Sequence, residues 1–317
     1  MGFLLLNPSE AVAGSRAGLM LWFQSVLPVL LPFFILSRLL ISINGIAPLT
    51  RLLSPLTRHI WGLSPMGTYA LLLGFLCGYP MGAKIAGDLV REGKITPAEG
   101  NYLLLFCNNV SPAFLMGFCL TEQLKAPALL SITLGLVYGL PLLLAVFWRK
   151  NFHNFTETNS ISHKFSQTQG QRNILSQKQA SGSQISFKIV DTCIMDGLES
   201  ILKLGCYIIL FSIMARLATQ IPWPNLLIGA ISVGILEITN GIALVCQLPL
   251  SFPIRYLTVL GFVILGGGSG LAQTQGMLVG SGLLVSRYIK AKLITAVTAL
   301  LLAAILFTVL PSLMLPR

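Results

Sequence analysis

Long apolar runs separated by short polar segments make up most of this chain. Eight runs can be recognised, at 19–43, 66–83, 102–120, 127–148, 201–218, 226–248, 257–278 and 293–313. Each is close to the length of about 20 residues that an α-helix needs to cross the hydrocarbon core of a bilayer. A sheet with an open edge would leave backbone groups unpaired in lipid, so the runs predict helices. The sequence therefore predicts an all-α, polytopic membrane protein.

Composition supports this prediction. Hydrophobic residues make up 54% of the chain and charged residues only 10%, which is too few for a water-facing surface. The net charge of +11 would suggest a nucleic-acid partner in a soluble protein. Here basic cytoplasmic loops explain it better, so we expect a multi-pass protein of a bacterial cell membrane, with lipid and not nucleic acid around it.

The polar segment at 149–190 divides the chain. It is rich in Gln, Ser, Asn and Thr and carries an excess of Lys and Arg. By the positive-inside rule we expect a cytoplasmic linker here, between a first transmembrane repeat at 1–148 and a second at 191–317.

The two halves share a pattern of interruptions. The first half is broken at Gly78–Gly82 and again at 108–112, and the second half at 237–241 and 266–270. Pro80 and Asn240, and then Ser111 and Ser269, are separated by nearly the same number of positions. This spacing indicates an internal repeat, as in many secondary transporters.

Two topologies fit the repeat. If every run crosses the membrane, the halves are parallel. If 66–93 and 226–248 are re-entrant hairpins, the halves are inverted. Charges crowd the segment after the first tip, including Lys84, Asp88 and Arg91. They would be costly against lipid but tolerable beside protein or water, which favours hairpins and inverted repeats. The segment at 46–61 fits either an amphipathic interfacial helix or an ordinary loop.

Backbone groups freed at the four breaks need partners at membrane depth, so the breaks predict a shared solute site, although Gly also serves helix packing. The predicted substrate-binding residues are Gly78, Tyr79, Pro80, Gly82, Lys84, Asn108, Asn109, Ser111, Glu237, Thr239, Asn240, Ser269 and Gln273. Lys84 either attracts an anion at a helix start or pairs with Asp88 four positions on. The asparagines either orient the solute or cap a helix.

Glu237 is the only acid in its apolar run. It is a candidate for proton or cation coupling, or else part of a buried salt bridge to Arg38, Lys203 or Arg216. Asp196, Glu199 and Lys203 share one helix face and indicate an ion-pair stripe or a cytoplasmic vestibule. The cysteines and histidines lack the spacing of metal ligands, and no catalytic motif is visible, so we expect no metal, no cofactor and no enzyme.

Five segments carry a family resemblance: 27–37, Gly-Tyr-Pro-Met-Gly-Ala-Lys at 78–84, Asn-Asn-Val-Ser-Pro-Ala-Phe at 108–114, Glu-Ile-Thr-Asn-Gly at 237–241 and Gly-Gly-Ser-Gly-Leu-Ala-Gln at 267–273. They resemble the nucleoside-recognition, or Gate-domain, membrane proteins. Within that group they look most like the integral membrane proteins of sporulation. The chain differs from the family pattern at Gly270 and Leu271, where Val and His are expected.

The resemblance implies a protein of the outer forespore membrane that moves dipicolinate, a planar dianion, during spore formation. Our leading hypothesis is thus a transporter of a small organic anion. The alternatives are a transporter of nucleoside-like solutes and a non-transporting sporulation scaffold that acts through the linker. The oligomeric state stays open.

Overall fold

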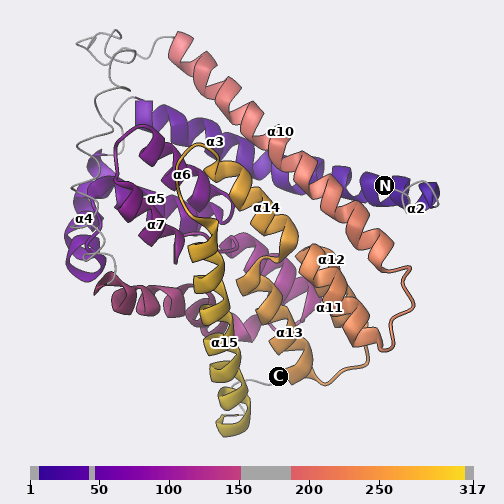
Figure 1. Ribbon diagram of the computed structural model, residues 1–317. Coiled ribbons are helices and arrows are strands. Elements are labelled where there is room, and N and C mark those ends of the chain that lie inside the picture. The colour runs from indigo at the N-terminus through magenta and orange to yellow at the C-terminus, as the bar shows by residue number, and fades with distance from the viewer. Residues whose placement is uncertain (1–6, 43–46, 151–186, 311–317) are drawn as a thin grey trace.

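The computed structural model describes residues 7–42, 47–150 and 187–310, and all elements in these ranges are helical (Figure 1). The first half contains α2 (Pro8–Leu21), η1 (Trp22–Val26), α3 (Leu27–Ser42), α4 (Ala47–Trp61), α5 (Pro65–Cys77), α6 (Met81–Arg91), α7 (Pro97–Leu104), η2 (Phe114–Gln123), η3 (Pro127–Leu129), α8 (Leu130–Leu134) and η4 (Gly135–Gly139). The second half contains α10 (Phe187–Ala218), α11 (Leu226–Leu236), α12 (Ile238–Gln247), α13 (Phe252–Leu265), α14 (Gly267–Leu278) and α15 (Val285–Val309). The predicted all-α fold is confirmed.

Four helical stretches are long and apolar enough to cross a membrane: Pro127–Lys150, Phe187–Ala218, Phe252–Leu278 and Val285–Val309. A fifth is reached if the bent pair Thr50–Trp61 and Pro65–Cys77 counts as one span. The predicted linker at 149–190 lies outside the described residues except at its two ends, so its cytoplasmic location stays a prediction.

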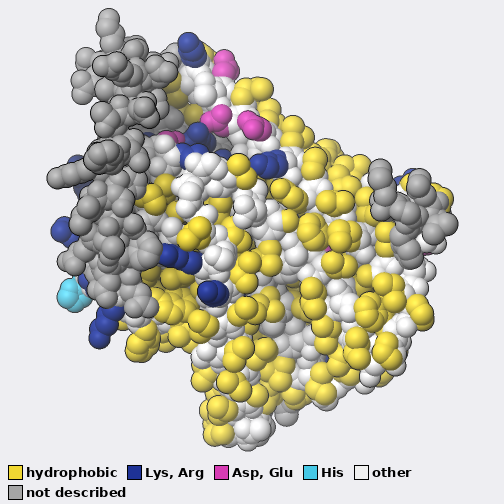
Figure 2. All heavy atoms as spheres, viewed as in Figure 1, with side chains coloured by type: hydrophobic (Ala, Val, Ile, Leu, Met, Phe, Trp, Pro, Cys, Tyr) yellow, Lys and Arg dark blue, Asp and Glu magenta, His cyan; other side chains and the backbone are white. Residues whose placement is uncertain are grey.

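The outer surface of the bundle is apolar. On α15, Leu293, Val297, Leu301 and Ile305 repeat every fourth position and are all more than half exposed, whereas the alanines on the opposite face are buried. A soluble protein would bury such a stripe, so this surface faces lipid. Hydrophobic side chains likewise cover most of the face seen in Figure 2, and charged side chains gather toward its upper left.

Both segments predicted as hairpins fold back on themselves. Gly74 of α5 lies against Gly82 of α6, so that a Cβ added to Gly74 would come within 3.0 Å of the Gly82 Cα. In the second half a Cβ on Gly241 would clash with the backbone of Gly234. Glycine is required where two helix backbones approach this closely. The other two broken segments, α7 with η2 and α13 with α14, follow their hairpins in the same order.

The first long helices of the two halves run side by side in opposite directions (Figure 1). Gly14 lies against Ile213, Gly18 against Ile209, and the Trp22 ring against Gly205. At the far end Arg38 bonds Asp196. Inverted repeats require this antiparallel pairing, although the repeat itself stays a prediction.

Candidate functional site

The first hairpin turns at Gly78 and Tyr79. Gly78 has a φ of +78°, which suits glycine alone, and its amide donates to the Gly74 carbonyl at 3.0 Å. The Tyr79 amide donates to the Asn109 carbonyl at 2.5 Å, and the cis Tyr79–Pro80 bond then leads into α6. The tip is thereby fixed against the break in the next helix.

The second hairpin turns at a single residue, Glu237. Its backbone is extended, with φ −143° and ψ +116°, between the end of α11 and the start of α12. Its Oε2 accepts a hydrogen bond from the Asn240 amide at 2.8 Å, so the carboxylate caps α12. A Cβ on Gly241 would clash with the backbone of α11, so glycine at this position allows the two helices to pack this closely after the turn.

The remaining two breaks each expose a hydroxyl. Ser111 Oγ accepts from the Phe114 amide at 3.2 Å and caps the helical segment that follows. In the second half Gly266 adopts the left-handed conformation, with φ +79°, between α13 and α14. Ser269 lies in the first turn of α14, and its Oγ accepts a hydrogen bond from Gln273 Nε2 of the next turn at 2.9 Å.

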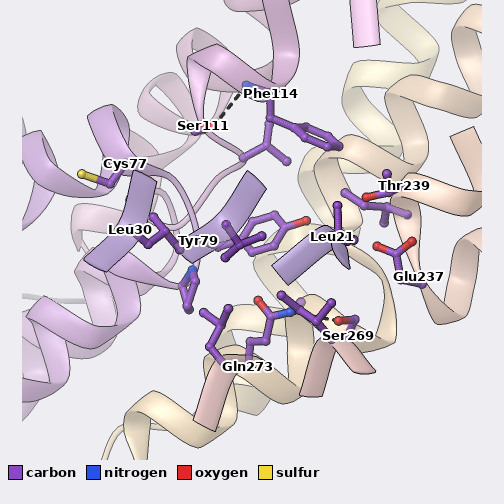
Figure 3. Close-up of a pocket in the computed structure, with 18 of the residues that line it drawn as sticks. Leu21, Leu30, Cys77, Tyr79, Ser111, Phe114, Glu237, Thr239, Ser269 and Gln273 are labelled. Atoms are coloured by element: carbon purple, nitrogen blue, oxygen red, sulfur yellow. Dashed lines mark hydrogen bonds between the residues drawn. The ribbon is translucent and has the colours of Figure 1, made fainter. Parts of the chain in front are cut away.

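All four breaks meet at one cavity of about 280 Å³, which we call the central cavity (Figure 3). Seven predicted site residues line it: Tyr79, Pro80, Ser111, Glu237, Thr239, Ser269 and Gln273. Apolar side chains complete the wall, among them Leu21 and Leu30 of the first half and Leu204 and Ile208 of α10. A mostly apolar wall with a few convergent polar groups is typical of small-molecule sites.

The lining comes mainly from the breaks and from the first turns of the helices after them. Tyr79 and Pro80 precede α6, Glu237 precedes α12, and Gly266 precedes α14. The positive ends of these helix dipoles therefore point toward the central cavity. Among the described residues that line the cavity, Glu237 contributes the one carboxylate, and none is a lysine or an arginine.

Lys84 lies elsewhere. Its Nζ is 3.2 Å from Asp88 Oδ2 and 5.6 Å from the centre of the Phe34 ring, and it is not among the residues that line the central cavity. Of the two interpretations offered by the sequence, the geometry fits the pair with Asp88. Lys84 instead lines a second cavity of about 320 Å³, the charged cavity, together with Arg38, Arg91, Asp196, Glu199 and Lys203.

The salt bridges proposed for Glu237 are absent among the described residues. Arg38 pairs with Asp88, Glu92 and Asp196, and Arg216 pairs with Glu10. Lys203 donates to the Gly276 carbonyl at 3.0 Å. The interpretation of Glu237 as one half of a buried pair with these cations is therefore wrong.

Asn108 and Asn109 are buried and lie behind the wall of the central cavity. Asn108 accepts from the Ala83 amide and donates to Thr274 Oγ1, at 3.2 and 3.0 Å. Asn109 donates to the Phe106 carbonyl at 2.8 Å. Asn240 is exposed, and Gly78 and Gly82 serve the close packing of the tip. These residues, like Lys84, do not line the central cavity.

One polar residue in this region was missed from the sequence. Lys292 is buried on α15, and its Nζ donates to Asn109 Oδ1 at 2.7 Å. The last apolar run of the sequence begins at Leu293, whereas α15 begins at Val285 and carries Lys292 inside the bundle. A lysine just before an apolar run ordinarily marks a membrane surface, so no sequence pattern indicates this placement. Within the described ranges, no cluster of three or more His, Cys, Asp or Glu residues could hold a metal ion.

Comparison with known proteins gives one informative relative. No family model matches the chain, and no solved structure matches it. The chain is similar to the sporulation integral membrane protein YlbJ of Bacillus subtilis (strain 168), with 26% identity over an alignment of 326 positions. The match covers 96% of this chain and 79% of YlbJ. This similarity along nearly the whole chain supports a YlbJ-type membrane protein.

Proposed function

We propose that this protein transports a small organic anion across a bacterial membrane during spore formation, with dipicolinate as the first candidate. The observation that carries the proposal is the convergence of four helix breaks from the two halves on the central cavity. Secondary transporters built from repeats bind their solutes at such broken helices near the bilayer midplane. The volume of about 280 Å³ lies just below the range for small-molecule sites, roughly 300–1,000 Å³, which limits the guest to a small solute.

The helix starts around the central cavity favour an anion. First-turn amides lack partners inside their own helix and carry partial positive charge, so they stabilise a carboxylate or phosphate. The start of α14 is the best placed, because Ser269, in the first turn of that helix, lines the cavity directly. Glu237 does not occupy that helix start, since its carboxylate caps α12.

The biological setting rests on the relative and on the family resemblance. The name of YlbJ assigns that protein to sporulation, and we extend the assignment to this chain as part of the proposal. Dipicolinate as cargo and the outer forespore membrane as location come from the resemblance. A planar dianion agrees with a narrow, partly apolar cavity.

A neutral, nucleoside-like solute is the second candidate. Lys84 pairs with Asp88 and does not line the central cavity, as this alternative requires. Hydroxyl and amide groups of Ser111, Thr239 and Gln273 would then read a sugar or base through hydrogen bonds.

Uptake into liposomes separates the candidates. The purified protein is reconstituted, and uptake of labelled dipicolinate is compared with that of a labelled nucleoside. Ser269→Phe should fill the cavity and abolish flux, whereas Ser232→Phe, on α11 outside the cavity, should leave it unchanged. Dipicolinate uptake well above that of empty liposomes supports the proposal. Nucleoside uptake alone supports the second candidate, and background flux of both solutes contradicts transport and favours the scaffold.

A further inference from the structure

Lys292 differs from the other buried lysine of the bundle. It is 5% exposed, its Nζ bonds the amide oxygen of Asn109, and the Tyr288 ring centre lies 5.6 Å away. Lys84 has a carboxylate at 3.2 Å. For Lys292, no carboxylate of the described chain lies within salt-bridge distance.

A lysine inside a membrane bundle without a counter-ion is expensive. An ammonium group loses its hydration there, and one amide oxygen and one ring face replace only part of it. A leucine or methionine would fill the same space on α15 at lower cost. The position of this charge therefore calls for a function beyond packing.

The ammonium group is close to the wall of the central cavity. Asn109, which accepts its hydrogen bond, is followed directly by the lining residues Val110 and Ser111. The backbone carbonyl of Asn109 also accepts from the amide of Tyr79, another lining residue. Asn109 thus connects Lys292 to residues of the wall, through its side chain on one side and its backbone carbonyl on the other.

We propose that Lys292 is the cation that makes the central cavity select an anionic solute. It acts through Asn109 as a positioning residue and does not touch the solute. An anion that enters the cavity supplies the counter-charge that the folded chain lacks, which lowers the free energy of the bound state relative to that of a neutral solute of the same shape. This inference rests on the proposed function and replaces Lys84 by Lys292 as the cation that reads the anion.

The test compares two solutes that differ in charge and not in ring shape: dipicolinate and the neutral diamide of the same pyridine ring. Their uptake ratio is measured in liposomes for the wild type and for Lys292→Met, Lys292→Arg and Lys290→Met. Lys290 is exposed on the same helix and provides the matched control. We expect Lys292→Met to lower the anion-to-neutral ratio about tenfold or more, and the other two variants to keep it.

Asn109→Asp separates electrostatics from packing. At this position an aspartate keeps the shape of asparagine and places a carboxylate oxygen about where Oδ1 now lies, 2.7 Å from the Lys292 ammonium. Its second oxygen replaces Nδ2, which donates to the Phe106 carbonyl, so we expect some loss of stability from that contact whatever the role of Lys292. The pair then cancels the positive charge without removing it. A structural role for Lys292 predicts an unchanged anion-to-neutral ratio in the folded variant. Our proposal predicts a ratio as low as that of Lys292→Met, and this variant decides if Lys292→Met does not fold.

The outcomes distinguish the two proposals. If the wild type carries dipicolinate and both Lys292→Met and Asn109→Asp keep the wild-type ratio, the role of Lys292 is wrong and the proposed function stands. If the wild type prefers the diamide, selection of an anion is refuted and the role of Lys292 with it. If wild-type flux of both solutes equals that of empty liposomes, the proposed function fails, and the inference fails with it.

Discussion

Glu237 uses one carboxylate for two tasks. It caps the first turn of α12 through the Asn240 amide, and it places the one acid of the lining residues at the central cavity. The cap offsets part of the cost of burying the charge, because the amides at a helix start stabilise an anion. In the proposed transport function this carboxylate lies beside the solute, where it is a candidate to bind and release a proton.

Glu237→Gln should separate the cap from the charge. The glutamine carbonyl can still accept from the Asn240 amide, so the variant should melt near the wild-type temperature, whereas Glu237→Ala should lose about 1 kcal/mol of stability with the cap. If Glu237 couples transport to protons, an inward proton gradient should accelerate uptake by the wild type but not by Glu237→Gln. Glu122→Gln, at an exposed site, is the control and should respond like the wild type. A full response of Glu237→Gln to the gradient would exclude proton coupling at this residue.

At the scale of single residues, the sequence predicted where the chain breaks better than where side chains point. Gly, Pro and Asn mark a break locally, so all four breaks were found, and Tyr79, Glu237 and Ser269 line the central cavity. Which side of a break a side chain faces depends on helices that are distant in sequence. Lys84 and Lys292 show this, because their surroundings are set by the ways in which α6 and α15 pack in the bundle.

At the scale of elements, glycine contacts define the two hairpins. A Cβ on Gly74 or on Gly82 would meet the Cys107 carbonyl, so the first hairpin also closes on the broken helix behind it. In the second hairpin, Gly234 lies under the Phe262 ring of α13 and against Gly241 of α12. Each hairpin is therefore fixed to the broken helix of its own half, which keeps the tips at the central cavity.

Gly241→Ala should destabilise the protein. The added methyl group would clash with the backbone of Gly234, which cannot move without opening the hairpin, and overpacking of this kind costs about 1–3 kcal/mol. Gly139→Ala is the matched control, since nothing lies within 4 Å of a Cβ there and alanine favours a helix by up to about 1 kcal/mol. Thermal unfolding in detergent should show a lower midpoint for the first variant and an equal or higher one for the second. Equal midpoints for Gly241→Ala and the wild type would mean that the two arms are not in close contact.

The segment at 46–61 shows what sequence periodicity can and cannot decide for an element. Its residues fitted an amphipathic helix or a loop, and α4 is a helix that meets α5 at 96°. Leu52 and Leu56 are exposed on it, one turn apart, and Arg51 and Arg58 are also exposed. This arrangement suits a helix that lies in the membrane interface with its leucines toward lipid. The angle to α5 could not be read from the sequence, because it depends on packing between elements.

At the scale of the whole molecule, the charged cavity lies next to the central cavity. Lys203 of α10 lines the first and Leu204 the second, and on α14 the wall passes from Gln273 to Gly276 within one turn. Arg38 ties α3 to α6 and α10 there through Glu92 and Asp196. The charged cavity lies at the half of α10 that contains Asp196 and Lys203, and a cytoplasmic vestibule at this place stays a prediction.

The direction of the first long helices leads to a topology that can be tested. Because α2 and α3 run antiparallel to α10, and each hairpin folds back on itself, we predict that each half makes an odd number of crossings and that the repeats are inverted. Ser9 and Gln220 should then share one side of the membrane, and Ser42 and Lys188 the other. By the positive-inside rule we predict that the side of Lys188 is cytoplasmic, since the basic segment ends there in the sequence.

Single cysteines at these four exposed positions, in a background without the native cysteines, test this arrangement in intact cells. A membrane-impermeant maleimide should label Ser9→Cys and Gln220→Cys directly, and Ser42→Cys and Lys188→Cys only after the membrane is permeabilised. Parallel repeats would place Ser9 with Lys188, because the first helices of the two halves would then cross in the same direction. Labelling in that pattern would contradict inverted repeats and would also be incompatible with the pairing of Gly14 with Ile213 and of Arg38 with Asp196. One experiment therefore tests the topology and the central packing of the bundle together.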